Sequence, residues 1–387
     1  MRPSVYFDFN ATTPLDARVR EAMLPCLGEI WGNPSSLHQI GQRARAVLDE
    51  ARDGAAAVLG CKPSEVVFTS GGTESANLGV MGAARHRKDK GRHIITTAIE
   101  HHAVLHACDY LAKNEGFEIT KLPVDVEGRV SVELLQRAFR PDTVLVSVMA
   151  ANNEIGTIQP VAEIGEVCRA RGVLFHTDAV QWFGKEPLQS VQQFNADLVS
   201  ICSHKIYGPK GAGALFIKSP FHPDPILLGG GHENERRAGT ENLASVVGFV
   251  EALKLFVREP VFSRQNLGPL RDRLLDFASS FEGVTCVTPR KKSLPNTAAF
   301  VVSGTDSIAL LANLDLEGIC ASSGSACSAG SLEPSHVIRA LGLEPHLQNS
   351  LVRFSLGRES SVEEVTFVER ILPSVISRSR QTQQVPR

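Results

Sequence analysis

Three segments of the sequence place reactive side chains directly after apolar runs. Lys205 ends "ADLVSICSHK", Asp178 follows "GVLFHT", and Thr73 follows the glycine pair of "EVVFTSGGT". Ligands in open α/β sheets collect at the carboxyl ends of the strands, so these residues could meet at one edge. A lysine held at a buried sheet end loses its proton more easily and can form an imine, whereas an ordinary exposed lysine is the alternative.

The turn at Gly71 and Gly72 precedes a predicted helix that begins at Thr73 and Glu74. Glycine permits a close backbone approach, and a helix start offers free N–H groups and a positive dipole end. Because Thr73 adds a hydroxyl, an anion fits this turn, most simply a phosphate. The alternative is a capped connection between strand and helix that binds nothing.

Asp178 is predicted near a strand end, on the same strand face as His176. A buried carboxylate needs a cationic or donor partner, and a protonated pyridine nitrogen is one candidate. The alternative is an aspartate that caps the next helix. A phosphate turn, an acid for a ring nitrogen and a lysine are together the parts that an aldehyde cofactor with a phosphate requires.

The segment "EHHAVLHA" offers His101, His102 and His106, which could suggest a metal site. Adjacent histidines point to different faces of a helix or strand, and no carboxylate or cysteine stands at ligand spacing on the same face. We therefore expect no metal. The flat imidazole of His101 is better suited to stacking on an aromatic ring and to moving protons.

The sequence "SSGSACSAGS" surrounds Cys327 with small residues, which predicts a mobile loop and an exposed thiol. At an unperturbed pKa of about 8.5 few thiols are ionised at neutral pH, so a neighbouring base or charge has to help Cys327 react. Cys320, in the apolar "LEGICA", is expected to be buried and inert. The eight cysteines include no C-x-x-C pair, which argues against a disulfide framework or an iron–sulfur cluster held by the chain.

The apolar runs alternate with helical patterns through the middle of the chain, and they are apolar throughout rather than at every second residue. This pattern indicates an α/β domain with a mainly parallel sheet buried on both faces. We predict a large domain over residues 14–257, a smaller α+β domain from residues 1–13 and 258–377, and a mobile tail over residues 378–387.

The charge balance is nearly even, with a formal net charge of −2 over 387 residues. Such a chain has no electrostatic footprint for nucleic acid or an anionic membrane. No run approaches the roughly 18 apolar residues of a membrane helix, and the N-terminus has no apolar signal core. We expect a cytoplasmic protein whose partners are small molecules or proteins.

Motifs along nearly the whole chain resemble, in the same order, those of the cysteine desulfurases, a group within the pyridoxal-phosphate superfamily that shares the aspartate-aminotransferase fold. The motifs are "FDFNATTPLD", "GNPSS", "TSGGTES", "EHHAVL", "NNEIGTIQP", "HTDAVQ", "SHKIYGPKG", "GGGHENERRAGTEN", "SSGSAC", "SLEPSHVIRALG" and "VRFSLGR". The resemblance implies that fold, a pyridoxal 5'-phosphate cofactor and a homodimer.

The resemblance also implies residue roles. Lys205 would carry the cofactor as a Schiff base, Asp178 would keep the pyridine nitrogen protonated, His101 would stack on the ring, and Cys327 would receive the sulfur. The remaining implied roles are Asn153 and Gln181 at the ring hydroxyl, Arg353 with Asn153 at the substrate carboxylate, and Gly72, Thr73, Cys202, Ser203, His204 and the second subunit's Thr240 at the phosphate. Position 202 departs from the pattern, since many relatives have serine there and a thiol is a weaker donor.

The implied reaction converts L-cysteine to L-alanine and leaves the sulfur on Cys327 as a persulfide, for delivery to an iron–sulfur scaffold or another acceptor protein. Selenocysteine lyase, on the same scaffold, is the nearest alternative. An aminotransferase or cysteine lyase without a persulfide is another. A catalytically silent assembly scaffold is the alternative from a different class, and the presence of Lys205, Asp178 and Cys327 argues against it.

Overall fold

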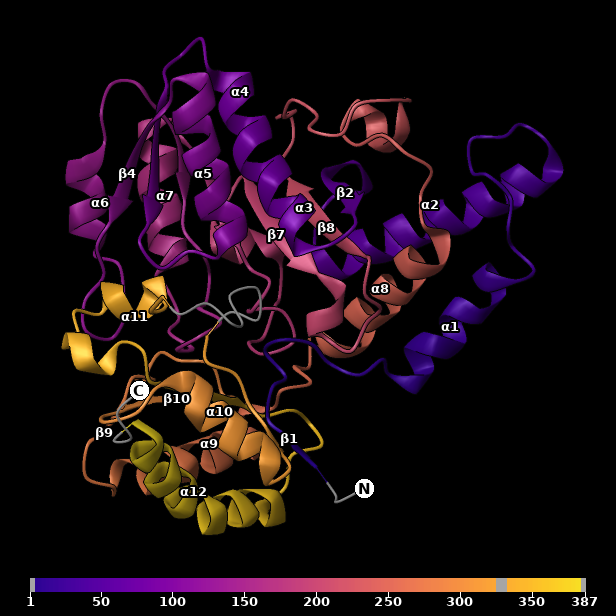
Figure 1. Cartoon of the computed structure of the whole chain (residues 1–387). Coiled ribbons are helices and arrows are strands. Elements are labelled where there is room, and N and C mark those ends of the chain that lie inside the picture. Colours follow the sequence, from indigo (N-terminus) through magenta and orange to yellow (C-terminus); the bar gives the residue numbers. More distant parts are fainter. Residues whose placement is uncertain (1–3, 325–332, 384–387) are drawn as a thin grey trace.

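A computed structural model describes residues 4–324 and 333–383 of the chain. Its centre is a seven-stranded sheet with strand order β2-β8-β7-β6-β5-β3-β4 (Figure 1). Neighbouring strands are parallel except for β8, which is antiparallel to both β2 and β7. The strands are β2 (Val66–Thr69), β3 (His93–Thr97), β4 (Glu118–Leu122), β5 (Thr143–Ser147), β6 (Leu174–Asp178), β7 (Leu198–Cys202) and β8 (Gly213–Ile217).

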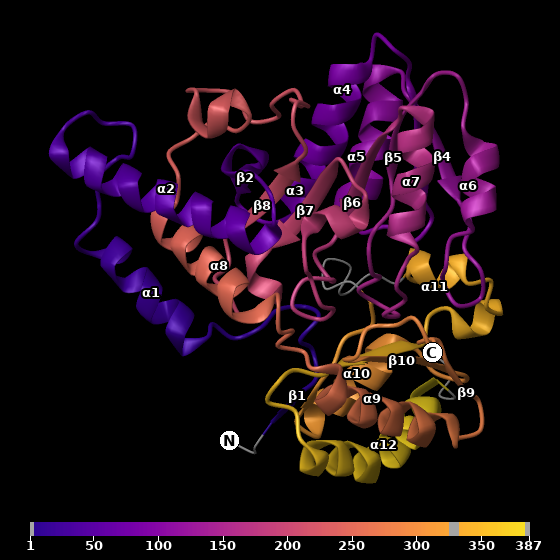
Figure 2. The same cartoon turned by 180° about the vertical axis from the view of Figure 1, so that it is seen from behind.

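Helices cover both faces of this sheet, because alternate strand residues point to opposite sides and nearly all of them are buried. Ile94 and Leu145 pack with the helices of one face, and Ile95 and Val146 with those of the other. The first face is covered by α3 (Gly72–Asn77), α4 (Ala83–Arg87) and α5 (His102–Glu115), and the second by α2 (Gln39–Leu59), α6 (Val132–Ala138), α7 (Val161–Arg171) and α8 (Leu243–Phe256) (Figures 1 and 2). The predicted α/β class is confirmed.

A smaller α+β part lies below the large sheet, at the carboxyl ends of its parallel strands (Figure 2). Its antiparallel sheet has the order β12-β10-β9, and β1 pairs with β11 in a separate parallel pair. The strands are β1 (Val5–Tyr6), β9 (Val284–Cys286), β10 (Thr297–Val302), β11 (Ile319–Cys320) and β12 (Leu351–Ser355). The helices are α9 (Arg264–Ser279), α10 (Ser307–Leu316), α11 (His336–Ala340) and α12 (Val362–Gln383).

The N-terminal segment runs through the smaller part before it reaches α1 (Ala17–Leu27). Phe7 N–H donates to the Cys320 carbonyl at 3.0 Å, and the Phe7 carbonyl accepts from Ser355 N–H at 2.7 Å. This segment is thereby inserted between β11 and β12. The contacts support our proposal that residues 1–13 and 258–377 form one domain, and that residues 14–257 form the other.

The predicted start of a mobile tail at residue 378 is wrong, because α12 continues to Gln383. Two arginines that we assigned to the tail bond to the smaller part. Arg378 pairs with Glu317 at 2.7 Å, and Arg380 Nε donates to the Ser303 carbonyl at 3.0 Å. These polar contacts hold the last helical turns, where the sequence has little apolar spacing. Residues 384–387 lie outside the described residues.

Within the described ranges, every helix is too short or too polar to cross a lipid bilayer.

Candidate active site

A cavity of about 190 Å³ lies where the carboxyl ends of the parallel strands meet the N-terminal segment. It brings together residues that are far apart in the sequence, as the strand-end prediction requires. Ten of the predicted site residues line it: Gly72, Thr73, His101, Asn153, Asp178, Gln181, Cys202, His204, Lys205 and Arg353.

Lys205 ends a short 3-10 turn (Ser203–Lys205) that directly follows β7. Its amine reaches across the cavity to the N-terminal segment, where Nζ donates to the carbonyls of Asn10 at 2.7 Å and Ala11 at 2.6 Å. Asn10 and Ala11 also line the cavity, and our reading of the sequence missed both. They belong to the motif "FDFNATTPLD", but only the long-range pairing of the N-terminal segment puts them beside Lys205.

Asp178 is the last residue of β6, and its carboxylate accepts from Val180 N–H at 3.0 Å. Burial raises the pKa of Asp178 to about 6, although the positive charge of Lys205 lowers it. A carboxylate in this setting is stabilised by a cationic donor inside the cavity. The protonated nitrogen of a pyridine ring supplies such a donor, so the position suits the predicted cofactor ring.

The turn that we predict to bind a phosphate connects β2 to the start of α3. Gly71 has φ +150°, and a Cβ built on Gly72 would lie 2.8 Å from Val180 Cγ2, so the backbone here approaches the end of β6 closely. A Cβ on Gly72 would also lie 3.5 Å from Cys202 Cβ, so the turn after β2 meets the end of β7 here. Gly72, Thr73, Cys202 and His204 all line the cavity, and backbone N–H groups beside the Thr73 hydroxyl form a suitable cup for phosphate oxygens.

Ser203 is not where we predicted it. It does not line the cavity: its N–H donates to the Ala212 carbonyl at 3.1 Å, and its hydroxyl faces Gly208, where a Cβ would lie only 2.1 Å from Oγ. Consecutive residues of the tight turn point in different directions, so the side chains of Cys202 and His204 reach the cavity and that of Ser203 does not.

His101 caps the start of α5, and its Nδ1 accepts the N–H of Ala103 at 3.1 Å. Burial, together with the positive charge of Lys205, lowers the pKa of His101 to about 4. The ring is therefore neutral near pH 7, and its proton is on Nε2 because Nδ1 accepts a hydrogen bond. Across residues 4–324 and 333–383, no group of three or more His, Cys, Asp or Glu side chains could hold a metal ion.

Arg353 is a buried guanidinium at the cavity wall, with 1% of its surface exposed. One Nη donates to Asp8 Oδ1 at 2.7 Å, and the other to the Asn153 carbonyl at 2.9 Å. Its Nε is buried and has no hydrogen-bond partner among the described residues. Nε and the Nη that contacts Asp8 lie on the same edge of the guanidinium fork, and such an edge matches the two oxygens of a carboxylate.

Besides Ser203, two predicted residues are not part of this cavity as the structure describes it. Thr240 is exposed, in a segment that the Arg237–Glu74 ion pair, at 2.7 Å, ties to the phosphate turn. Cys327 lies outside the described residues. The cavity is therefore lined by residues that we predict to contact the cofactor and the substrate carboxylate. The roles of Thr240 and Cys327 stay predictions.

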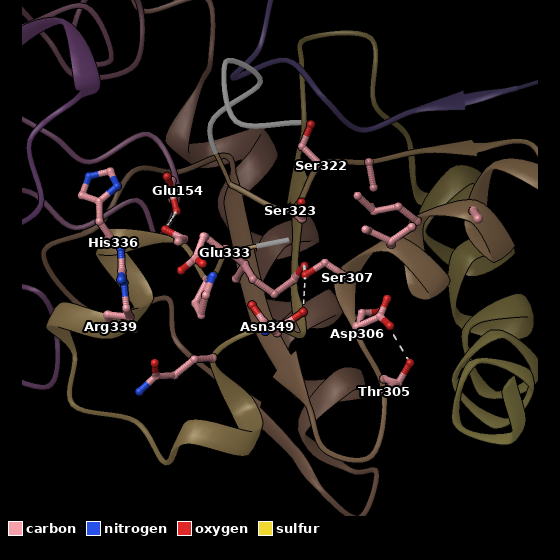
Figure 3. Close-up of a pocket in the computed structure, with 18 of the residues that line it drawn as sticks. Glu154, Thr305, Asp306, Ser307, Ser322, Ser323, Glu333, His336, Arg339 and Asn349 are labelled. Carbon is pink, nitrogen blue, oxygen red and sulfur yellow. Dashed lines mark hydrogen bonds between the residues drawn. The ribbon is translucent and has the colours of Figure 1, made fainter. Parts of the chain in front are cut away.

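A larger cavity of about 1040 Å³ adjoins the first one on the side of α10 and α11 (Figure 3). None of the predicted site residues that the structure describes lines it. Its walls include Glu154, which follows Asn153 in the chain, and Ser322, whose backbone exchanges hydrogen bonds of 2.6 and 3.2 Å with Arg353. Ser323 and Glu333, from either side of residues 325–332, also line it. The segment that carries Cys327 thus begins and ends beside this cavity.

The thiol at position 202 permits a test of the phosphate cup. Burial raises the pKa of Cys202, so the group is an un-ionised thiol and a weak donor. We expect Cys202→Ser to bind pyridoxal phosphate about fivefold more tightly, because one net hydrogen bond is worth about 1 kcal/mol. Fluorescence titration of the apoprotein measures this, with Cys61→Ser, remote from the cavity, as the control. Unchanged or weaker binding by Cys202→Ser alone would count against a phosphate at this position.

The chain is similar in sequence to a known family and to proteins within it. Residues 5–368 match the model of the class V aminotransferase family. The chain is 44% identical to the cysteine desulfurase IscS of Dictyoglomus turgidum, over 98% of this chain and 96% of that protein. It is 45% identical to the putative cysteine desulfurase IscS 1 of Bacillus subtilis, over 97% of this chain and 99% of that protein.

The chain also has the same fold as solved structures of NifS-like proteins. A NifS-like protein superposes with a TM-score of 0.90 at 37% identity, over 97% of this chain and 99% of the other. A NifS-like protein from Rickettsia africae gives a TM-score of 0.85 at 31% identity, with the same coverage. Both matches extend over the large and the small parts of the chain. The chain therefore belongs to the class V aminotransferase family and, within it, to the cysteine desulfurases.

Proposed function

We propose that this chain is a pyridoxal-phosphate enzyme that converts L-cysteine to L-alanine and transfers the sulfur to its own Cys327 as a persulfide. The observation that carries the proposal is the cavity in which Lys205, Asp178, His101 and Arg353 converge from four separate segments. The names of the relatives, cysteine desulfurases over nearly the whole chain, support the same reaction.

The residues of the cavity suit each part of the cofactor. Asp178 would pair with the ring nitrogen, the neutral ring of His101 would stack on the ring face, and the cup of Gly72, Thr73 and His204 would take the phosphate. When bound through Lys205, the cofactor supplies a sink for electrons from the bonds at the α-carbon of the amino acid.

Substrate binding depends on Arg353. Its edge of Nε and Nη can hold the cysteine carboxylate by two parallel hydrogen bonds, while Asp8 and the Asn153 carbonyl keep the guanidinium plane fixed. Fixing the carboxylate orients the α-carbon toward Lys205, whose amine can then take the α-proton.

Sulfur transfer requires a thiolate. We assign that role to Cys327, whose sulfur attacks the sulfur of the substrate. The new S–S bond forms as the C–S bond of the substrate breaks, and the bonding electron pair stays on the carbon side. Protonation of that carbon gives alanine, and Cys327 is left as a persulfide. Cysteine and one thiol become alanine and one persulfide, so no external oxidant or reductant is needed.

We also propose a homodimer in which Thr240 contacts the phosphate of the partner subunit. Helices α1 and α2 and the loop that joins them project from the body of the molecule (Figure 1), and the loop exposes the large apolar side chains of Trp31 at 70% and Leu37 at 90%. Apolar patches of this kind mark protein–protein contacts. Light scattering that gives the mass of a monomer at micromolar concentration would contradict the dimer.

The persulfide has to reach an acceptor, and we propose an iron–sulfur scaffold or another acceptor protein in the cytoplasm. The "SLEPSHVIRALG" stretch, which includes α11, and helix α12 resemble regions that dock such a scaffold. Pull-down of the persulfide-bearing enzyme with candidate acceptors tests this. Labelled sulfur that moves only to small thiols would contradict an acceptor protein.

The proposed reaction has a direct test. Purified protein incubated with pyridoxal phosphate should turn yellow, and borohydride should bleach it by reducing the imine at Lys205. With L-cysteine and an excess of a reducing thiol, it should release alanine and sulfide in equal amounts. A protein that binds the cofactor but produces pyruvate and ammonia, or no amino acid product, would contradict the proposal.

A further inference from the structure

A second buried lysine lies next to the active site and has no role in the proposed reaction. Lys185 has 1% of its surface exposed, and it comes from the turn after β6 that also carries Gln181. Gly184, at φ +73°, lets this turn approach the lysine loop, since a Cβ there would lie 2.7 Å from Ile206 Cγ2. The turn is therefore packed directly against the residue that follows Lys205.

The amine of Lys185 bonds to two side chains of the cofactor cavity. Its Nζ donates to Asn10 Oδ1 at 2.7 Å and to Gln181 Oε1. Asn10 is the shared partner, because its backbone carbonyl also accepts from Gln181 Nε2 at 3.0 Å and from Lys205 Nζ at 2.7 Å. Lys185, Gln181, Asn10 and Lys205 thus form one buried hydrogen-bonded network.

This network permits only one orientation of the Gln181 amide. Rotating the amide by half a turn would place Oε1 against the carbonyl of Asn10, where two acceptors repel, and would replace the acceptor of Lys185 by an NH₂ group. In the observed orientation one N–H of Gln181 is used by Asn10. No described residue accepts the second N–H, and Gln181 lines the cofactor cavity.

The two hydrogen bonds of Lys185 do not require its positive charge. Burial, together with the positive charges of Lys205 and Arg353, lowers the pKa of Lys185 well below its usual value. An uncharged amine still has two N–H groups, one for each of the two oxygens it contacts. Nζ also lies over the ring of Phe262, 5.2 Å from its centroid.

We propose that Lys185 is a positioning residue that keeps an N–H of Gln181 directed at the ring oxygen of the cofactor. The inference rests on the proposed function, in which Gln181 contacts that oxygen. A hydrogen bond donated to the ring oxygen stabilises its anion, and it therefore favours loss of the proton that the oxygen shares with the imine nitrogen. Lys185 would in this way set the pH at which the enzyme-bound chromophore titrates.

The test is the visible absorption of the holoenzyme as a function of pH. We expect Lys185→Met to raise the pH midpoint of the absorption change by roughly one unit, as loss of an N–H donor at the ring oxygen requires. Gln181→Met should raise it by the same amount. In the double variant the two shifts should not add, because Lys185 acts through Gln181.

Lys254→Met, at an exposed lysine of α8, is the matched control and should leave the midpoint unchanged. If methionine at 185 prevents folding, Lys185→Gln replaces it, alone and combined with Gln181→Met. The test still applies, because it asks whether the two shifts in the pH midpoint add and not how large each shift is. A lower unfolding temperature with an unchanged midpoint, or shifts that add fully, would overturn the proposal. A wild-type protein without visible absorption would instead contradict the proposed function, so the two failures can be told apart.

Discussion

Replacing Lys205 by alanine should lower the rate of alanine release from cysteine by about a thousandfold or more, because the variant loses both the amine that holds the cofactor and the base at the α-carbon. In the structure Nζ spans the cavity to Asn10 and Ala11, and no other described lysine lines this cavity. The measurement is alanine release under saturating cysteine and cofactor.

The matched control for this variant is Lys210→Ala, which removes an exposed lysine five residues further along the same loop. We expect wild-type rates from it, and a yellow protein that borohydride bleaches. Lys205→Ala should bind pyridoxal phosphate reversibly and lose all of it on dialysis. Native rates from Lys205→Ala would remove the basis of the whole site assignment.

Replacing Cys327 by serine should lower desulfurase activity by a similar factor of about a thousand, since a hydroxyl does not attack the sulfur of cysteine at neutral pH. Cofactor binding should be unaffected, because the described residues of the cofactor cavity remain in place. Absorption spectra and alanine release, measured on the same preparation, separate the two properties.

Cys320→Ser is the control here, because burial raises the pKa of the Cys320 thiol and β11 holds it in the sheet pair with β1. It should keep its activity. Selenocysteine as substrate adds a second comparison, since a selenol leaves more readily than a thiol and needs no attacking thiolate. If Cys327→Ser turned over cysteine at the native rate, the persulfide mechanism would be wrong and the selenocysteine lyase or plain lyase alternatives would gain support.

The sequence predicted the parts of the site that depend on strand ends. Apolar runs located β6 and β7, and the residues that follow them, Asp178 and Lys205, do meet at one cavity. This works because the carboxyl ends of parallel strands lie at a common edge, whatever the length of the chain between them.

Other parts of the site could not be predicted from local patterns. Asn10 lines the cavity, and Asp8 holds Arg353, only because the N-terminal segment crosses between β11 and β12, and this contact joins residues more than 300 positions apart. Ser203 was misplaced for a local reason, since spacing does not say which residue of a tight turn faces inward. Arg378 and Arg380 hold the last turns of α12 through polar contacts, and the spacing of apolar residues cannot predict such contacts.

The most direct test of the central claim is a single turnover with sulfur-labelled L-cysteine, followed by alkylation, digestion and mass spectrometry of the peptide around Cys327. We predict one labelled sulfur atom on Cys327 per active site, in an amount equal to the alanine released, and none on Cys320. Alanine release with the label in solution and an unmodified Cys327 would contradict the account.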